Sequence, residues 1–307
     1  MAVETTPVMT GSPVHRKSRD SWFVRWGLVG VTVLIVGVLV GIPLVAVFSH
    51  ALGRGLCTYW ENLTASPDTR HAIFLSLVVA PVAVGLNVVF GVAAAWVIAR
   101  FRFPGRTVLT TLIDLPFSVS PVVAGLAFVL LFGLQTPLGD WLRANGYQVI
   151  FAPPGMVLAT AFVTFPFVAR ELIPVLEANG PEEELVARSL GAGGWDLFWR
   201  ITLPNIKWGL LYGVILCNAR AMGEFGAVYV VSGRIGGQTD TIPLQVQKLF
   251  DTPGSHGTPA AFALASVLTL LALVTLVAKV LIEPRLREKP PSEPAEAGSP
   301  LAGRTSL

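Results

Sequence analysis

Six long apolar stretches constrain what this chain can fold into. Each is long enough for a helix to cross the ~30 Å hydrocarbon core of a bilayer, which takes about 20 residues. Because lipid offers backbone N–H and C=O groups no hydrogen-bond partners, such single segments are expected to be helical. The sequence therefore predicts an all-α, polytopic membrane protein with six transmembrane helices. The stretches cover roughly residues 26–48, 72–98, 109–134, 155–174, 209–231 and 261–282.

The composition agrees with a membrane protein. Hydrophobic residues make up 53% of the chain and charged residues 13%, whereas soluble domains carry roughly a quarter charged residues. The formal net charge of +3 is explained by basic flanks of membrane helices, so we expect no nucleic-acid partner. Cys57 lies in a loop and Cys217 in an apolar stretch. We therefore expect both to remain thiols rather than to form a disulfide framework.

Lysine and arginine are distributed unevenly among the segments that flank the apolar stretches. Because these residues favour the cytoplasmic side, the richer set predicts cytoplasmic N- and C-termini and a cytoplasmic loop at 182–204. The first apolar stretch exceeds the about 7–15 residues of a signal-peptide core, which indicates a membrane anchor. The richer set is Arg16, Lys17, Arg19, Arg25, Arg100, Arg102, Arg106, Arg188, Arg200, Lys207, Arg285, Arg287 and Lys289, and the opposite set is Arg54, Arg70, Arg143, Arg234 and Lys248.

The loop at 182–204 has a clear local pattern. Pro181 suits the first turn of a helix, and the three glutamates that follow favour the positive end of the helix dipole. Gly191 suits a left-handed cap at the end of this helix. After a glycine turn we expect a second short helix that carries Trp199 and ends at Pro204. Two short helices with exposed apolar side chains suit the groove of a partner protein. The alternative is an interfacial pair whose tryptophans rest among lipid headgroups.

This loop resembles the cytoplasmic signature of permease subunits of ATP-binding-cassette importers. The signature is Glu-Ala-Ala, three residues, glycine, nine residues and Ile-x-Leu-Pro, and the chain matches it from Ala187 through Gly191 to Pro204. It departs at the front, where Glu184 lies one place early. The resemblance implies a coupling loop, residues 177–206, that sits in a cleft of an ATPase subunit. Its expected coupling residues are Glu184, Ala187, Gly191, Trp195, Phe198, Trp199, Ile201, Leu203 and Pro204.

Two further segments extend the resemblance, DLPFSVSPVVAG at 114–125 and the segment 204–233. They are similar to the permeases of sulfate/thiosulfate importers, specifically the W-type subunit, within the sulfate/molybdate type-I permease family. The similarity covers about residues 70–283. It implies the type-I importer permease fold and ATP-driven import of sulfate or thiosulfate across the bacterial plasma (inner) membrane. The ARxxGEFG core at 219–226 is shared with molybdate and tungstate permeases, which are the alternative.

The resemblance also implies the partners. They are a homologous permease subunit in a heterodimer, two ATP-binding-cassette ATPase subunits, an extracytoplasmic sulfate/thiosulfate-binding protein, and membrane lipid. The chain contains no GxxxxGK[ST] sequence, so we expect ATP to be bound by the partner subunits and no cofactor in this chain. Its histidines are scattered and no nucleophile–base arrangement is recognisable. We expect no metal site and no catalytic residues, and therefore a non-catalytic subunit.

Two charged residues are expected inside the fifth apolar stretch. Arg220 and Glu224 are four residues apart, which predicts one helix face, and charges at this depth are costly unless paired or facing water. Either they form an ion pair that locks helix packing, or Arg220 lines the path of a divalent oxyanion and Glu224 holds its geometry. An ion-coupled secondary transporter would need more intramembrane charges than these, Asp114 being marginal. The expected translocation-path residues are Arg220, Glu224, Gly223, Ser118, Ser120 and Asn218, the last three with capping or interhelical bonding as the alternative role.

The chain divides into three predicted parts. Residues 1–69 hold a cytoplasmic tail, the first transmembrane helix and an external loop, and residues 70–283 form the permease domain. Residues 284–307 are rich in Pro, Glu, Gly and Ser, which is typical of a disordered tail. Within the permease domain, the two prolines of 114–125 predict an irregular start to the third span.

Overall fold

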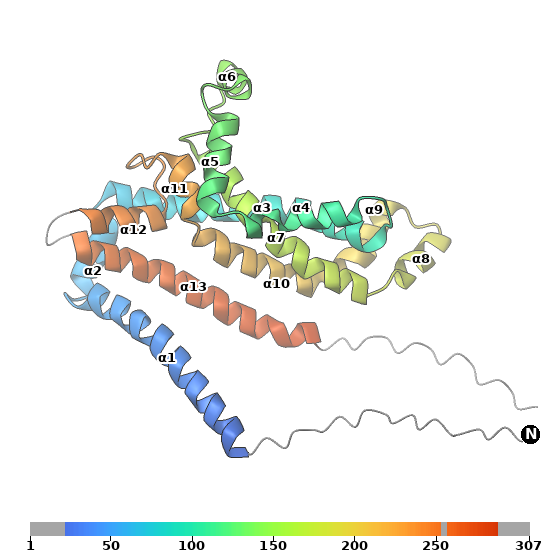
Figure 1. The fold of residues 1–307 in the computed structure, drawn as a ribbon, viewed down its shortest axis with the longest axis horizontal. Helices are drawn as coiled ribbons and strands as arrows, with labels where there is room; N and C mark the ends of the chain where they lie inside the picture. Colours follow the sequence, from blue (N-terminus) through green and yellow to red (C-terminus); the bar gives the residue numbers. More distant parts are fainter. Residues whose placement is uncertain (1–21, 253–256, 288–307) are drawn as a thin grey trace, which may run out of the picture. The chain divides into compact units, whose positions relative to one another are not determined.

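The structure of the chain, a computed structural model, describes residues 22–252 and 257–287. Residues 1–21, 253–256 and 288–307, which include most of the tail expected to be disordered, lie outside the described residues. Every regular element within the described ranges is a helix (Figure 1), which confirms the predicted all-α class. The helices are α1 Trp22–Leu52, α2 Leu56–Thr64, α3 Pro67–Arg100, α4 Arg106–Ser118, α5 Pro121–Phe132, α6 Pro137–Ala144, α7 Pro153–Ala178, α8 Glu182–Ser189, α9 Gly194–Leu197, the π-helical turn η1 Phe198–Thr202, α10 Leu203–Met222, α11 Gly226–Ser232, α12 Ile242–Asp251 and α13 Gly257–Arg287.

The membrane-spanning elements are of two kinds. α1, α3, α7 and α13 are each long and apolar enough to cross a membrane as single helices. Two further candidates are bent helix pairs, in which α4 and α5 meet at 109° and the helical stretch Gly194–Met222 meets α11 at 54°. The described residues thus contain four unbroken candidate spans, or six if each bent pair is one span. The upper number agrees with the six predicted stretches.

The break in the third span lies inside the proline-containing segment 114–125, where the sequence predicted an irregularity. α4 is helical from Arg106, so this irregularity does not begin the span but divides it, at Val119 and Ser120. Both residues have extended ψ angles, 132° and 135°. Proline disfavours the helical conformation of the residue before it, and Pro121 therefore ends α4 and begins α5 as a separate helix.

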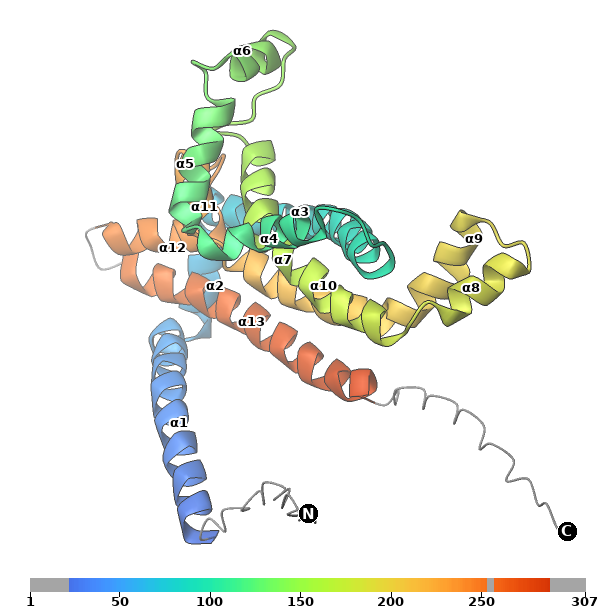
Figure 2. The same ribbon diagram turned by 45° about the vertical axis from the view of Figure 1, so that its right-hand side comes forward.

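The second unit of the chain, residues 47–307, is built around α3, α7 and α10, which lie side by side in Figures 1 and 2. Small residues allow this close packing: a Cβ on Gly91 of α3 would lie 3.0 Å from Val168 of α7, and one on Gly209 of α10 would lie 2.9 Å from Val175. A buried polar bridge joins the three helices, since Asn87 Nδ2 donates to Thr164 Oγ1 at 2.8 Å and lies 3.5 Å from Cys217 Sγ. Small residues and interhelical hydrogen bonds are typical of helix contacts in membranes.

Short helices cover the end of this unit opposite α8 and α9 (Figure 2). α2 and α12 pack on α13 through a cluster that includes Leu63, Ile242 and Leu264. The backbone N–H of Ile242 donates to Ser76 Oγ at 2.8 Å, which anchors the start of α12 on α3. α6 projects beyond the end of α5 in both views.

The first compact unit, residues 1–46, is described only from Trp22 onward, and that part belongs to α1. The candidate span Val24–Leu52 has a mean hydropathy of 2.8, and none of its most apolar window is buried. Its composition is that of a lipid-facing helix. The three predicted sequence parts, with boundaries at 69 and 283, stay a prediction.

Candidate functional site

The coupling loop begins as the sequence predicts. α8 runs from Glu182 to Ser189, with all three glutamates in its first turn. Gly191 follows with φ +88°, the left-handed conformation expected of a glycine cap. The predicted first helix and its cap are confirmed.

The second half of the loop differs from the prediction. The expected short helix does not end at Pro204, because α9, η1 and α10 form one helical stretch from Gly194 to Met222. The reason is the π-helical turn, in which the N–H of Leu203 bonds to the carbonyl of Phe198, five residues back. The widened turn shifts the hydrogen-bond register just before Pro204, so the missing N–H of the proline does not end the helical stretch.

Apolar side chains of the coupling loop are exposed. Leu190 is 83% exposed, Trp195 75% and Trp199 51%, and the two tryptophan rings lie 5.7 Å apart with Phe198 beside them. Among the other expected coupling residues, Pro204 is exposed, and Ala187, Phe198, Ile201 and Leu203 are half-buried. An exposed apolar group of this kind marks an interaction surface.

Glu184 does not belong to that surface. It is 8% exposed, and its Oε1 accepts from Arg100 Nε at 3.1 Å and from Thr202 Oγ1 at 3.0 Å. Arg100 Nη1 also donates to the carbonyl of Leu176 at 2.8 Å. These bonds join the ends of α3 and α7 to α8 and η1, so Glu184 positions the loop rather than presenting a charge to a partner. The sequence shows Arg100 only as one of several basic residues after an apolar stretch, and its role was therefore missed.

A second layer of polar contacts surrounds this junction. Arg106 Nη2 lies 2.6 Å from Glu177 Oε1, and Asn205 Nδ2 donates to Glu183 Oε2. The Arg106–Glu177 pair is exposed on both sides, at 42% and 47%. Exposed pairs contribute only about 0–1 kcal/mol, so the buried Glu184 contacts dominate the attachment of the loop.

The second candidate site is the break between α10 and α11, which we call the mid-span junction (Gly223–Phe225). Arg220 Nη1 lies 2.7 Å from Glu224 Oε2. The two residues do not share a helix face as expected, because α10 ends at Met222 and Glu224 lies in the break. The free carboxylate oxygen, Oε1, accepts from the backbone N–H of Ala227 at 3.0 Å and so caps α11. Because the Arg220 side chain is 36% exposed and that of Glu224 is 1% exposed, one partner of the pair remains accessible.

The two broken spans meet at their breaks. A Cβ on Gly226 would lie 3.0 Å from Pro121 Cβ, and one on Gly125 would lie 2.7 Å from the carbonyl oxygen of Ala227. The starts of α5 and α11 are therefore in direct contact, which the sequence alone did not indicate. Of the remaining path candidates, Ser118, Ser120 and Gly223 are exposed at the two breaks, and Asn218 is half-buried on α10. Ser120 makes no side-chain hydrogen bond to cap α5.

The spans contain more charged residues than Arg220 and Glu224. Arg170 of α7 forms a bidentate ion pair with Asp114 of α4, in which Nε donates to Oδ1 at 2.7 Å and Nη2 donates to Oδ2 at 2.8 Å. The Arg170 guanidinium also lies 5.3 Å from the Phe117 ring centre. Glu171 is the next residue of α7. The interpretation that Arg220 and Glu224 are nearly alone is therefore wrong. Arg170 and Glu171 were missed because they interrupt an otherwise apolar stretch near its end.

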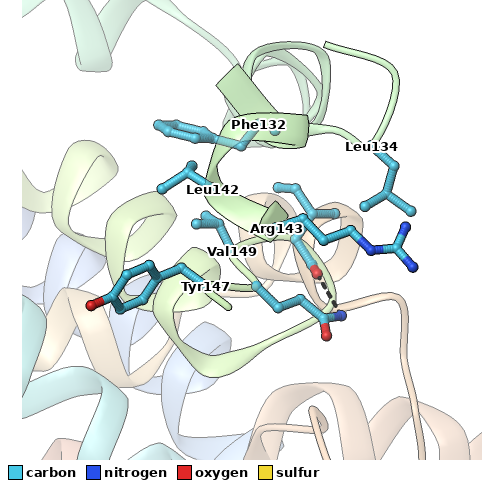
Figure 3. Close-up of a pocket in the computed structure, with 9 residues that line it drawn as sticks. Phe132, Leu134, Leu142, Arg143, Tyr147 and Val149 are labelled. Atoms are coloured by element: carbon cyan, nitrogen blue, oxygen red, sulfur yellow. Dashed lines mark hydrogen bonds between the residues drawn. The ribbon is translucent and has the colours of Figure 1, made fainter. Parts of the chain in front are cut away.

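A separate pocket of about 130 Å³ lies between α5, α6 and the segment that follows α6 (Figure 3). It is lined by Phe132, Leu142, Arg143 and Tyr147, and beside it Gln148 Nε2 donates to the carbonyl of Ile150 at 3.2 Å. None of the predicted site residues lies there. Within the described ranges, no three His, Cys, Asp or Glu side chains come together as a metal site would require.

Comparison with known proteins gives consistent results. Residues 87–288 match the family described as binding-protein-dependent transport system inner membrane component. The chain is 49% identical over 248 residues to the sulfate transport system permease protein CysW of Escherichia coli (strain K12), which covers 80% of this chain and 85% of that protein. It is 38% identical over 239 residues to CysT, another sulfate transport system permease protein of the same organism, covering 78% and 85%.

A solved structure shares the fold. The bacterial alginate ABC transporter, in complex with a periplasmic protein that holds an alginate pentasaccharide, contains a chain that superposes with a TM-score of 0.66. The alignment covers 86% of this chain and 94% of that one, at 17% sequence identity. This similarity concerns the arrangement of helices alone.

Proposed function

Because the chain belongs to the family of binding-protein-dependent transport system inner membrane components, we propose that it is the permease subunit through which an ATP-binding-cassette importer carries sulfate and thiosulfate across the plasma membrane. The observation that supports the assignment of sulfate as the substrate is the 49% identity to a sulfate permease over 80% of the chain. The subunit itself is non-catalytic. It provides the path, and the ATPases supply the energy.

The complex contains four kinds of subunit in this proposal. A second permease similar to CysT, a relative at 38% identity, pairs with this chain as a heterodimer. Two ATPase subunits dock on the cytoplasmic side, and a binding protein delivers the anion from outside. Both termini are cytoplasmic, in accordance with the distribution of lysine and arginine.

The coupling loop transmits the movement of the ATPase. Leu190, Trp195 and Trp199 form the apolar contact, while the buried bonds of Glu184 attach the loop to α3 and α7. Since Gly194–Met222 is one helical stretch, a push on the aromatic group moves α10 along its length. That movement ends at the mid-span junction, where α10 gives way to α11.

Arg220 contacts the anion at this junction. Its guanidinium is partly exposed and can donate paired hydrogen bonds to a tetrahedral oxyanion. Glu224 balances its charge, which weakens anion binding enough for release. The contact is transient, as a carrier requires.

The substrate is tested by ATP-dependent uptake of radiolabelled sulfate in a strain that lacks this subunit, before and after its restoration. We expect restored uptake that excess thiosulfate blocks and molybdate barely affects. Restoration of molybdate accumulation without sulfate uptake would keep the permease and overturn the substrate.

The apolar contact is tested by charge insertion. Trp199→Glu places a carboxylate in the exposed aromatic group, and a buried unpaired charge at an interface costs about 2–5 kcal/mol. We expect ATPase co-purification and sulfate uptake to be lost. Trp60→Glu is the control, because Trp60 is similarly exposed, at 66%, but lies on α2 at the other end of the unit. ATPase binding and uptake that survive in the Trp199 variant would contradict the proposed docking surface.

A further inference from the structure

A small cavity lies beside the mid-span junction. It holds about 10 Å³ and is lined by residues of α3, α7, α10, the α10–α11 break, α11 and the residue that precedes α12. Four of the lining side chains are polar, namely Ser76, Thr160, Glu224 and Thr241. All four are at most 6% exposed.

Three oxygens of these side chains have no hydrogen-bond partner. They are Thr160 Oγ1, Thr241 Oγ1 and Glu224 Oε2, the last of which contacts Arg220 as an ion pair but is not within hydrogen-bonding geometry. Buried polar atoms are almost always hydrogen-bonded, to protein or to ordered water. Two unpaired hydroxyls and a carboxylate oxygen that can accept a further hydrogen bond therefore indicate a shared partner.

We propose that one buried water molecule occupies this cavity. About 10–15 Å³ is enough for a single water, provided that two to four polar groups surround it. The water donates one hydrogen to the Glu224 carboxylate and the other to one threonine hydroxyl, and it accepts a hydrogen from the second threonine. This arrangement gives both threonine hydroxyls a partner and Glu224 Oε2 a hydrogen bond beside its ion pair with Arg220.

A water fits the site better than a metal cation. The charge of Glu224 is already balanced by Arg220, whose Nη1 lies 2.7 Å from Oε2. A cation bound there would lie close to the guanidinium and be repelled by it. A neutral molecule with two donors and two acceptors has no such conflict.

The water joins elements that no direct side-chain hydrogen bond joins at this point. Thr160 belongs to α7, Thr241 precedes α12, and Glu224 caps α11. The break between α10 and α11 is thereby tied both to the helical core and to the segment anchored by Ser76. This inference does not depend on which substrate the protein carries.

A double-mutant cycle on the purified transporter complex tests the shared water. Thr160→Val and Thr241→Val each remove one hydroxyl at nearly constant volume, and each is expected to lower the melting temperature by about 2–4 °C. Because the first substitution already releases the water, the double variant should melt close to the less stable single variant. Strictly additive losses would overturn the proposal.

Two controls make the cycle specific. Thr160→Ser keeps the hydroxyl and should keep the non-additivity with Thr241→Val. Thr269→Val removes a hydroxyl that bonds within its own helix, to the carbonyl of Ala265, and should combine additively with Thr241→Val.

Two further measurements do not rely on the double-mutant cycle. A high-resolution map of the wild-type complex should show density within hydrogen-bond distance of all three oxygens, and a resolved cavity without density would overturn the proposal. The melting temperature should be the same in sodium, potassium and choline chloride. A stabilisation by sodium that disappears in Thr241→Val would assign the site to a cation instead.

Discussion

Two buried glutamates hold the two candidate sites in place, and they do so in different ways. Glu184 bonds to Arg100, 84 residues earlier in the chain, and to Thr202. Glu224 pairs with Arg220, four residues earlier, and caps α11 through the N–H of Ala227. The first glutamate joins distant elements, whereas the second determines the shape of one local break.

This difference means that the contacts of Glu184 attach the coupling loop to other helices, whereas those of Glu224 lie within one span. The coupling loop is held on the ends of α3 and α7 by bonds that must break if it detaches. The mid-span junction has its ion pair within one span, and α11 is packed against α5 and α7. We infer that the loop and α10 move as one piece, and that this movement ends at the junction.

The largest effect is expected from breaking the distant pair. Arg100→Ala leaves the Glu184 carboxylate buried without its guanidinium, and removing one partner of a buried pair costs about 3–5 kcal/mol. We expect a lower melting temperature and loss of ATPase co-purification. Arg106→Ala is the matched control, because its partner Glu177 is 47% exposed. Equal effects of the two substitutions would contradict a special role for Arg100.

The local pair should behave differently. Arg220→Ala removes the charge-assisted hydrogen bonds that the guanidinium donates to the transported anion. Such bonds contribute about 1.5–3 kcal/mol, so sulfate uptake should fall about tenfold or more. The complex should still insert and assemble, although the buried Glu224 charge, left without its ion-pair partner, lowers its stability.

The double variant Arg220→Ala with Glu224→Gln decides between the two roles of Arg220. It removes the unpaired charge, so stability should recover while uptake remains low. Uptake that recovers together with stability would assign Arg220 a packing role alone.

A smaller effect is expected at the cap between α8 and α9. Gly191 has φ +88°, and a left-handed conformation costs a residue other than glycine about 1–2 kcal/mol. Gly191→Ala should loosen the coupling loop and reduce uptake partially. Gly194→Ala is the control, since a Cβ there meets nothing within 4 Å and its φ is not left-handed. If both variants transport alike, the cap does not set the geometry of the loop.

The smallest effect is expected at Pro204. Because the helix continues through this residue, Pro204→Ala should change stability by less than about 1 kcal/mol and leave uptake nearly unchanged. A large loss of uptake would indicate that Pro204 acts as a hinge after all. Hydrogen exchange over 198–210 would then show where the helix opens.

Local patterns in the sequence predicted the helices and several of their ends. The apolar stretches, the glutamates at the start of α8 and the glycine at 191 each report a preference that acts within one or two turns. The exposed position of Trp195 and Trp199 was also predictable, because both residues lie in the loop that connects two apolar stretches. These features depend on neighbours in the chain, so one sequence is enough to see them.

The tertiary structure decided the features that depend on distant contacts. No pattern around Glu184 indicates that it faces Arg100, and none around Thr160 indicates that it shares a cavity with Thr241 and Glu224. The continuation of α10 through Pro204 likewise depends on a widened turn at Phe198–Thr202. A buried polar group is stable only beside a partner, and which partner is near is determined when α3, α7 and α10 pack together. The sequence alone was enough to predict a polytopic all-α permease with a structured loop at 182–204, whereas packing determined which of its charges face inward.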